Sequence, residues 1–133
     1  MGSVFVTRSG DPDPNEVEGR EPCASITFGG TYFFLYPEIL RLRDQTGELI
    51  DPQANAFFFG PKLDRLQGFL AASQSLAAAQ PDTWEQRVGV SGANGEVIHH
   101  TTTRHEVLQL LGDLVGAVQS ARERQMGVLF LGE

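Results

Sequence analysis

The chain has 133 residues, a hydrophobic fraction of 41%, ten basic residues and a formal net charge of −7. This length and composition allow one hydrophobic core, so we expect a single domain that folds without disulfides or a metal ion. The basic residues form no group larger than the pairs Arg41/Arg43 and Arg122/Arg124. Nucleic-acid binding is therefore not expected, because that function needs a basic stripe to neutralise phosphates.

Cysteine content and the first residues of the chain favour a cytoplasmic location. Cys23 is the single cysteine, so no internal disulfide can form, which fits a reducing compartment. Residues 1–6 carry neither the basic region nor the long apolar region of a secretory signal. The aromatic run at residues 31–36 is too short to cross a bilayer. We therefore expect a cytoplasmic protein without a membrane contact.

The N-terminal region divides into a short strand at residues 3–7 and an acidic segment at residues 8–22. The acidic segment contains three prolines and almost no apolar side chains. Because such a segment cannot offset its ordering entropy by burial, we expect it to be a flexible loop or arm. The predicted organisation is a strand and a flexible segment at residues 1–22, followed by a single α+β domain at residues 23–133.

Residues 24–47 predict a strand and a helix. Residues 24–28 alternate weakly and precede a pair of glycines, which favours a strand and a tight turn. Residues 31–36 fit either a second hairpin strand or the lead-in to a helix. Pro37 suits the first position of that helix, because an N–H there would have no partner within the helix and proline lacks one. Gly47 suits the end of the helix.

Two long helices are predicted at residues 61–79 and 103–125, where apolar side chains recur with helical spacing. Thr103 and Glu106 form a capping box at the start of the second helix, in which each side chain bonds the other residue's backbone N–H. Gly127 can end that helix, and an apolar strand follows. The stripe of the second helix that should face the core comprises Val107, Leu111, Leu114 and Val118.

Residues 84–102 predict a β-hairpin, because Asn94-Gly95 is a favoured pair for a two-residue type I′ turn. With that pair as the loop, Val90 would lie opposite His99. The strands do not alternate regularly with the helices, which favours the α+β class. We predict one domain with an antiparallel sheet of about four strands packed against three helices.

The histidines are the candidates for metal binding or acid–base chemistry. His99, His100 and His105 lie close to Glu106 in the sequence and have the chemistry of zinc ligands. Adjacent strand residues face opposite sides, so His99 and His100 cannot easily share a metal, and the capping box already uses Glu106. We therefore expect no metal, no cofactor and no catalytic site. A small hydrolase that uses one of the histidines is the least favoured alternative.

The carboxylates suggest a protein interface. Glu48, Asp51 and Asp64 surround an aromatic run that contains Phe58. Acidic residues around an aromatic anchor suit an interface in which charges steer association and the anchor holds the complex. We predict that these four residues contact a protein partner with a basic face. Alternatively, Tyr32, Phe33, Tyr36 and residues 57–59 line a small-ligand pocket, or the chain forms a homo-oligomer.

In its size, acidity and plain α+β design, the chain resembles bacterial immunity or inhibitor proteins, which bind and block a toxin enzyme. This resemblance implies a non-enzymatic, cytoplasmic protein-binding module that blocks a basic partner.

Overall fold

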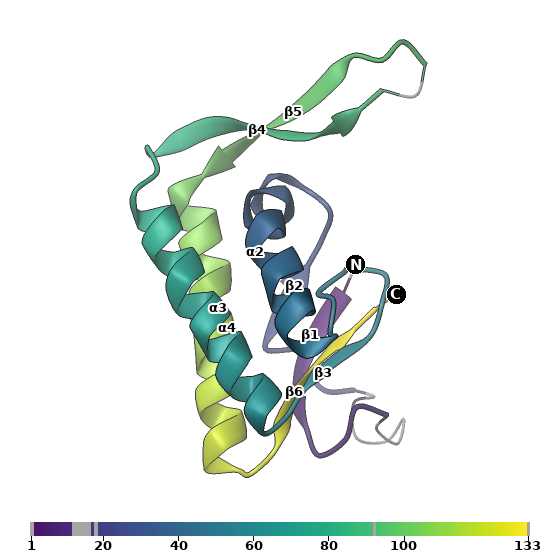
Figure 1. Ribbon diagram of the computed structural model, residues 1–133, viewed down its shortest axis with the longest axis vertical. Coiled ribbons are helices and arrows are strands. Elements are labelled where there is room, and N and C mark those ends of the chain that lie inside the picture. The colour runs from purple at the N-terminus through teal and green to yellow at the C-terminus, as the bar shows by residue number, and fades with distance from the viewer. Residues whose placement is uncertain (1, 12–16, 18, 92, 133) are drawn as a thin grey trace.

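The structure is a computed structural model that describes residues 2–11, 17, 19–91 and 93–132. Within these residues, three helices and two antiparallel sheets, one of four strands and one of two, confirm the predicted α+β class (Figure 1). The body contains β1 (Gly2–Thr7), β2 (Ala24–Ile26), α2 (Gly30–Thr46), β3 (Ala56–Phe58), α3 (Pro61–Ala78), α4 (Arg104–Glu123) and β6 (Gly127–Leu131). The projecting hairpin at the top of Figure 1 consists of β4 (Thr83–Val90) and β5 (Val97–Thr103), and we call it the arm.

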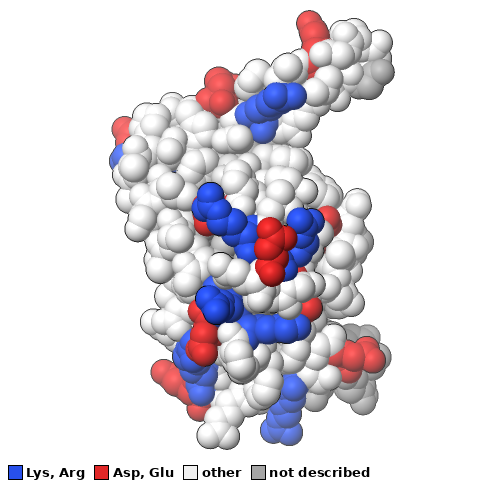
Figure 2. Space-filling view, in the orientation of Figure 1, with Lys and Arg blue, Asp and Glu red and all other residues white. Residues whose placement is uncertain are grey.

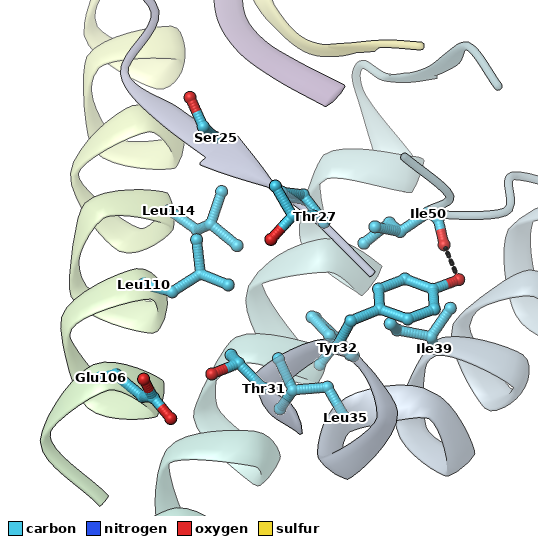
Figure 3. Close-up of a pocket in the computed structure, with 12 residues that line it drawn as sticks. Ser25, Thr27, Thr31, Tyr32, Leu35, Ile39, Ile50, Glu106, Leu110 and Leu114 are labelled. Carbon is cyan, nitrogen blue, oxygen red and sulfur yellow. Dashed lines mark hydrogen bonds between the residues drawn. The ribbon is translucent and has the colours of Figure 1, made fainter. Parts of the chain in front are cut away.

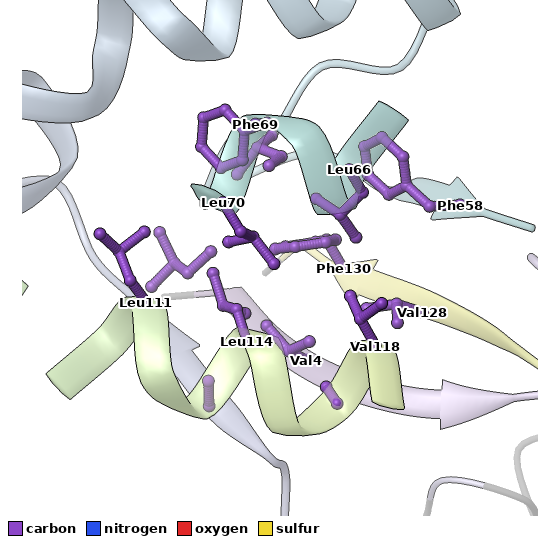
Figure 4. Close-up of a cluster of buried hydrophobic side chains, with 14 of the residues drawn as sticks. Val4, Phe58, Leu66, Phe69, Leu70, Leu111, Leu114, Val118, Val128 and Phe130 are labelled. Carbon is purple, nitrogen blue, oxygen red and sulfur yellow. The ribbon is translucent and has the colours of Figure 1, made fainter. Parts of the chain in front are cut away.

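The sheet of the body has the strand order β2-β1-β6-β3, and every neighbouring pair is antiparallel. Because side chains alternate along a strand, residues in register form rows that point to one face. In one row, Val6 lies beside Val128, which lies beside Phe58. All three side chains are buried and belong to the same core as the apolar stripes of the helices (Figure 4).

The helices bury the stripes that the sequence predicts. Every predicted core residue of α4 is buried, and α3 packs against both α2 and α4. The capping box of α4 is confirmed, because Thr103 Oγ1 accepts from the Glu106 N–H at 3.0 Å and Glu106 Oε1 accepts from the Thr103 N–H at 2.8 Å. Gly127 does not end this helix as predicted. Gln125 adopts the left-handed conformation there, with φ 55°, and Gly127 begins β6.

The start of α2 resolves the ambiguity at residues 31–36 in favour of a helix. Pro37 lies inside α2, so its predicted place at the first helical position was wrong. The helix starts at Gly30, which lies so close to the arm that a Cβ would come within 1.8 Å of the Thr102 hydroxyl oxygen. Gly47 follows α2 as predicted, with a φ of 78°.

The first strand, β1, is central in the body sheet and pairs with both β2 and β6. The N-terminal region therefore contributes to the same core as the rest of the chain. Much of the acidic segment predicted to be flexible, namely residues 12–16 and 18, lies outside the described residues. In its described part, Arg20 donates to the Val6 carbonyl oxygen at 3.2 Å, and its guanidinium lies 5.9 Å from the centre of the Phe5 ring.

The loop of the arm is longer than the sequence predicts. Val90 pairs with Val97, so the predicted pairing of Val90 with His99 was wrong. The loop is closed by two backbone hydrogen bonds, from Ser91 to Glu96 at 2.7 Å and from Gly95 to Ser91 at 3.0 Å. These bonds favour a wider turn than the two-residue loop that Asn94-Gly95 suggests.

Candidate functional site

The arm is packed at its root and exposed at its tip. At the root, the rings of Trp84 and Phe34 lie 5.1 Å apart between centres, and Thr102 is fully buried. Within the described residues no third strand pairs with the outer edge of β4 or of β5. Three large aliphatic side chains at the tip remain between 40% and 50% exposed: Val90, Val97 and Ile98.

These aliphatic side chains occupy both faces of the arm. Val90 and Val97 are register partners, so they share one face. Ile98 shares the opposite face with Thr102, because alternate residues of a strand point the same way. Thr102 lies against Gly30 of α2. The face of the arm that carries Ile98 at the tip is therefore the face that packs on the body at the root.

A polar hollow of about 520 Å³ lies between the arm and the start of α2. Figure 2 shows the arm standing clear of the body, with a recess beneath it. Gly29, Gly30 and Thr31 line the hollow on one side. Because α2 has neither a side-chain N-cap bond nor an acidic residue in its first turn, its first N–H groups carry an uncompensated partial positive charge.

The structure brings two of the three histidines to this hollow. His99 and His100 line it together with Glu106, whereas His105 does not. Glu106 is held by the capping box at the same time. Across the described part of the chain, no group of three or more histidine, cysteine or acidic side chains is placed to hold a metal ion. The hollow thus presents hydroxyl, imidazole and carboxylate groups beside the N-terminus of α2.

Phe58, which the sequence predicts as a partner contact, is fully buried in the core. Its ring lies 5.6 Å from that of Phe130 in an edge-to-face arrangement. The prediction fails for this residue because strand alternation turns its side chain toward the helices. Its neighbour Phe59 is the exposed aromatic of this run, 53% exposed and stacked on Phe57.

The three predicted carboxylates have local partners. Glu48 accepts a hydrogen bond from a β3 backbone N–H at 2.7 Å, and its other oxygen lies 3.4 Å from the Lys62 ammonium. Asp64 accepts from Arg122 of α4 at 2.6 Å. Asp51 accepts from a backbone N–H two residues later. These side chains therefore take part in local structure, and Glu48 does so directly beside the aromatic run, at Phe57.

The aromatic residues predicted to line one pocket form two separate groups. Tyr32, Phe33 and Tyr36 contact one another on α2, and Phe28 joins them, while residues 57–59 belong to the β3 region. The Tyr32 hydroxyl donates to the Ile50 carbonyl oxygen at 2.8 Å. Burial raises the pKa of Tyr32 far above its usual value, and the nearby Asp51 and Tyr36 add to the shift.

Charge is mixed over the face of the body that Figure 2 displays, where basic and acidic side chains alternate across the helices. A groove between α2 and α3 has this character, with Glu38, Arg41, Asp64 and Arg65 in its lining. Glu38 and Arg41 form an ion pair. The negative net charge is therefore not concentrated on this face.

The sequence predicts the hairpin but not the exposure of its apolar tip. The available signal was local, since Val90, Val97 and Ile98 flank a polar loop while the neighbouring strand positions are mostly polar. Their exposure follows from tertiary packing, because in the described part of the chain no strand pairs with the arm beside them.

Comparisons of the chain with protein-family models, with curated proteins and with solved structures find no match. In the part of the chain that the structure describes, none of the helices has the length and apolar character needed to cross a bilayer.

Proposed function

We propose that this protein is a non-enzymatic, cytoplasmic protein-binding module that engages its partner through the tip of the arm. The observation that carries the proposal is the exposure of Val90, Val97 and Ile98 on a two-stranded sheet. An isolated two-stranded hairpin is marginally stable in water, and no other element of the described chain covers the apolar side chains on the two faces of the tip. A partner that covers the tip would bury these apolar side chains and so stabilise the two-stranded sheet.

The backbone of the arm supports the same proposal. In the described part of the chain no strand lies along the outer edge of β4 or of β5, so an extended partner segment can add a strand there. The side chains on the two faces would then set specificity, because they alternate toward opposite sides of the added strand.

The charge of the chain favours a partner with a basic face. A net charge of −7 attracts basic molecules over distances of roughly a Debye length, about 10 Å at 0.1 M salt. An inhibitor of the immunity type, which covers a basic surface of an enzyme, is the particular form of binding module that we propose. Its association rate should fall as salt rises, while dissociation changes less.

The experiment compares tagged wild-type protein with two variants as baits in lysate of the native host, read out by quantitative mass spectrometry. The arm variant combines Val90→Thr, Val97→Thr and Ile98→Thr, which keeps β-branched side chains suited to strands. The control is Leu76→Gln, which changes an aliphatic residue that is 47% exposed on α3. We expect the arm variant to lose about tenfold or more of the captured partner, as for interface hot spots, and the control to retain it.

Sedimentation of the purified protein tests whether the partner is a second copy. A wild-type dimer that becomes monomeric in the arm variant would identify self-association through the arm. Equal capture by the arm variant and the wild type would refute the proposal, as would a monomeric wild type that captures nothing above the level of an empty bait.

A further inference from the structure

A second feature of the body is a cavity of about 190 Å³ between β2, α2 and α4, which adjoins the hollow under the arm because Thr31 and Glu106 line both. Figure 3 shows Leu110 and Leu114 entering it from α4, opposite Tyr32 and Ile39 of α2. Leu110 and Leu114 are four residues apart, so they lie one turn apart on the same face of α4. The remaining apolar wall comes from Ile26, Leu35, Ile50 and Phe69.

The size of this cavity matches a single ring. Protein interiors are close-packed, and voids larger than a water molecule are few. In other proteins, an apolar cavity of about 150 Å³ stays dry and accepts benzene. A space of 190 Å³ with leucine, isoleucine and phenylalanine walls therefore suits a ring-sized apolar guest.

The rim of the cavity is polar and offers hydrogen-bond acceptors. In Figure 3 the Thr31 hydroxyl and the Glu106 carboxylate face each other at the mouth, and the Thr27 hydroxyl points inward. Glu106 Oε1 accepts from the Thr103 N–H, while its second oxygen can accept from a guest. The Tyr32 hydroxyl already donates to Ile50, so Tyr32 contributes the face of its ring.

Two opposite fixed charges flank the mouth and select the charge of the guest. Glu106 disfavours an anion there. The N-terminus of α2, which begins at Gly30 beside Thr31, lacks an acidic residue in its first turn and disfavours a cation. A neutral guest avoids both penalties, and a hydroxyl on it can donate to Glu106 while accepting from Thr31.

We propose that this cavity is a binding site for a small neutral ring alcohol, with its ring among Leu35, Ile39, Leu110 and Leu114 and its hydroxyl at Thr31 and Glu106. Neutral aromatic and alicyclic alcohols are the ligand class. The tip residues Val90, Val97 and Ile98 do not line this cavity, so ligand binding and partner binding can be tested separately.

The first experiment titrates wild-type protein with four probes of one ring size: benzyl alcohol, toluene, benzoate and benzylamine. Binding is followed by the methyl resonances of Leu110 and Leu114 in NMR. Benzyl alcohol should bind about 10- to 100-fold more tightly than toluene, which is the range for a hydrogen bond to a charged acceptor. Benzoate and benzylamine should both bind more weakly than benzyl alcohol.

Two substitutions in α4 and a surface control sharpen the test. Leu110→Trp should fill the cavity and abolish benzyl alcohol binding, whereas Gln119→Trp, at an exposed position of the same helix, should bind as the wild type does. Glu106→Gln keeps an acceptor for the capping box but removes the negative charge. It should raise the affinity for benzoate relative to benzylamine by about tenfold, because one of the two opposed fixed charges is gone.

The proposal is overturned if saturating benzyl alcohol leaves the Leu110 and Leu114 methyl resonances unmoved, or if folded Leu110→Trp binds it as the wild type does. If Leu110→Trp does not fold, intermolecular nuclear Overhauser effects between benzyl alcohol and these methyl groups in the wild type decide the question. Their presence supports the site, and their absence at saturation refutes it. Equal affinities for benzyl alcohol and toluene would refute the role of the rim.

Discussion

The sheet of the body and the sheet of the arm are both antiparallel, yet they differ in what covers them. In β6, residues 127–130 are all buried: Val128 and Phe130 face the helices, and Leu129, on the other face, lies between Phe5 and Phe57 of the neighbouring strands. In β5, residues 97–101 are all exposed. Burial of apolar surface is the main source of stability in a domain, so the body is expected to stabilise itself and the arm to depend on its root.

This difference shows where an apolar residue serves the fold and where it is available to a partner. Val128 and Val97 are both valines in strands, but Val128 is fully buried and Val97 is 47% exposed. Substitution of the first should be costly for folding, and substitution of the second should be costly for binding. The contrast between body and arm can therefore be tested residue by residue.

The largest expected effect compares two leucines of α3. Leu66 is fully buried and Leu76 is 47% exposed. Leu66→Ala should lower the free energy of unfolding by about 2–5 kcal/mol, the range for truncating a buried leucine. Leu76→Ala should change it by less than about 0.5 kcal/mol. Urea titrations of both variants measure the difference, and similar midpoints would contradict the assignment of the core.

The junction between body and arm is tested by Gly30→Ala. The added Cβ would lie 1.8 Å from the Thr102 hydroxyl oxygen, so the arm or α2 must shift. We expect a loss of about 1–3 kcal/mol, typical of overpacking. In a Thr102→Ala background the same substitution should cost less, and this double-mutant cycle isolates the contact. Additive effects of the two substitutions would mean that this contact does not join arm and body.

Tyr32→Phe tests a buried hydrogen bond of the body. It removes the donor to the Ile50 carbonyl oxygen while keeping the ring. The unpaired carbonyl should cost about 1–3 kcal/mol at neutral pH, measured by denaturant unfolding. A matched control is Tyr36→Phe, whose side chain is 37% exposed and which should cost less than about 0.5 kcal/mol.

The same tyrosine predicts a loss of stability at high pH. Burial raises the pKa of Tyr32 in the folded state, so the unfolded chain releases this proton first as the pH rises. The contribution of Tyr32 to the free energy of unfolding is therefore fully present below pH about 10, which is the pKa of tyrosine in the unfolded chain. Above that pH it declines by at most about 1.4 kcal/mol per pH unit. Tyr32→Phe lacks this decline, so the stability gap between wild type and variant should narrow above pH about 10. A constant gap would contradict the raised pKa.

Loss of the capping box, at the junction of β5 and α4, should lower the free energy of unfolding by a smaller amount. Thr103→Ala removes the acceptor for the Glu106 N–H. We expect a loss of about 1 kcal/mol, the usual value for a helix N-cap, seen as a lower urea midpoint. Thr103→Ser keeps the hydroxyl and should recover most of that loss. Failure of Ser to recover it would show that the methyl group, rather than the cap, matters.

The smallest expected effect on stability is at the tip of the arm. Val97→Thr and Ile98→Thr should each change the free energy of unfolding by less than about 0.5 kcal/mol, because these side chains are partly exposed and threonine keeps the β-branched shape. Thermal unfolding of each variant beside the wild type checks this. A loss as large as that of Leu66→Ala would show that the tip is part of the core and remove the basis for the proposed interface.

Much of this fold is determined by patterns within a few residues of one another. The capping box of Thr103 and Glu106, the buried stripe of α4 and the α+β class all follow from helical spacing, cap chemistry and the order of the elements. These features depend on neighbours three or four residues away in the chain, so a single sequence contains the information needed to predict them.

The tertiary structure alone decided which surfaces stay open. Phe58 faces the core because β3 pairs with β6, and α2 begins at Gly30 in close contact with Thr102 of the arm. The exposure of Val97 and the cavity beside Leu110 depend in the same way on what the rest of the chain covers or leaves uncovered. Each of these results from contacts between segments far apart in the sequence, where burial is set by packing and not by local pattern.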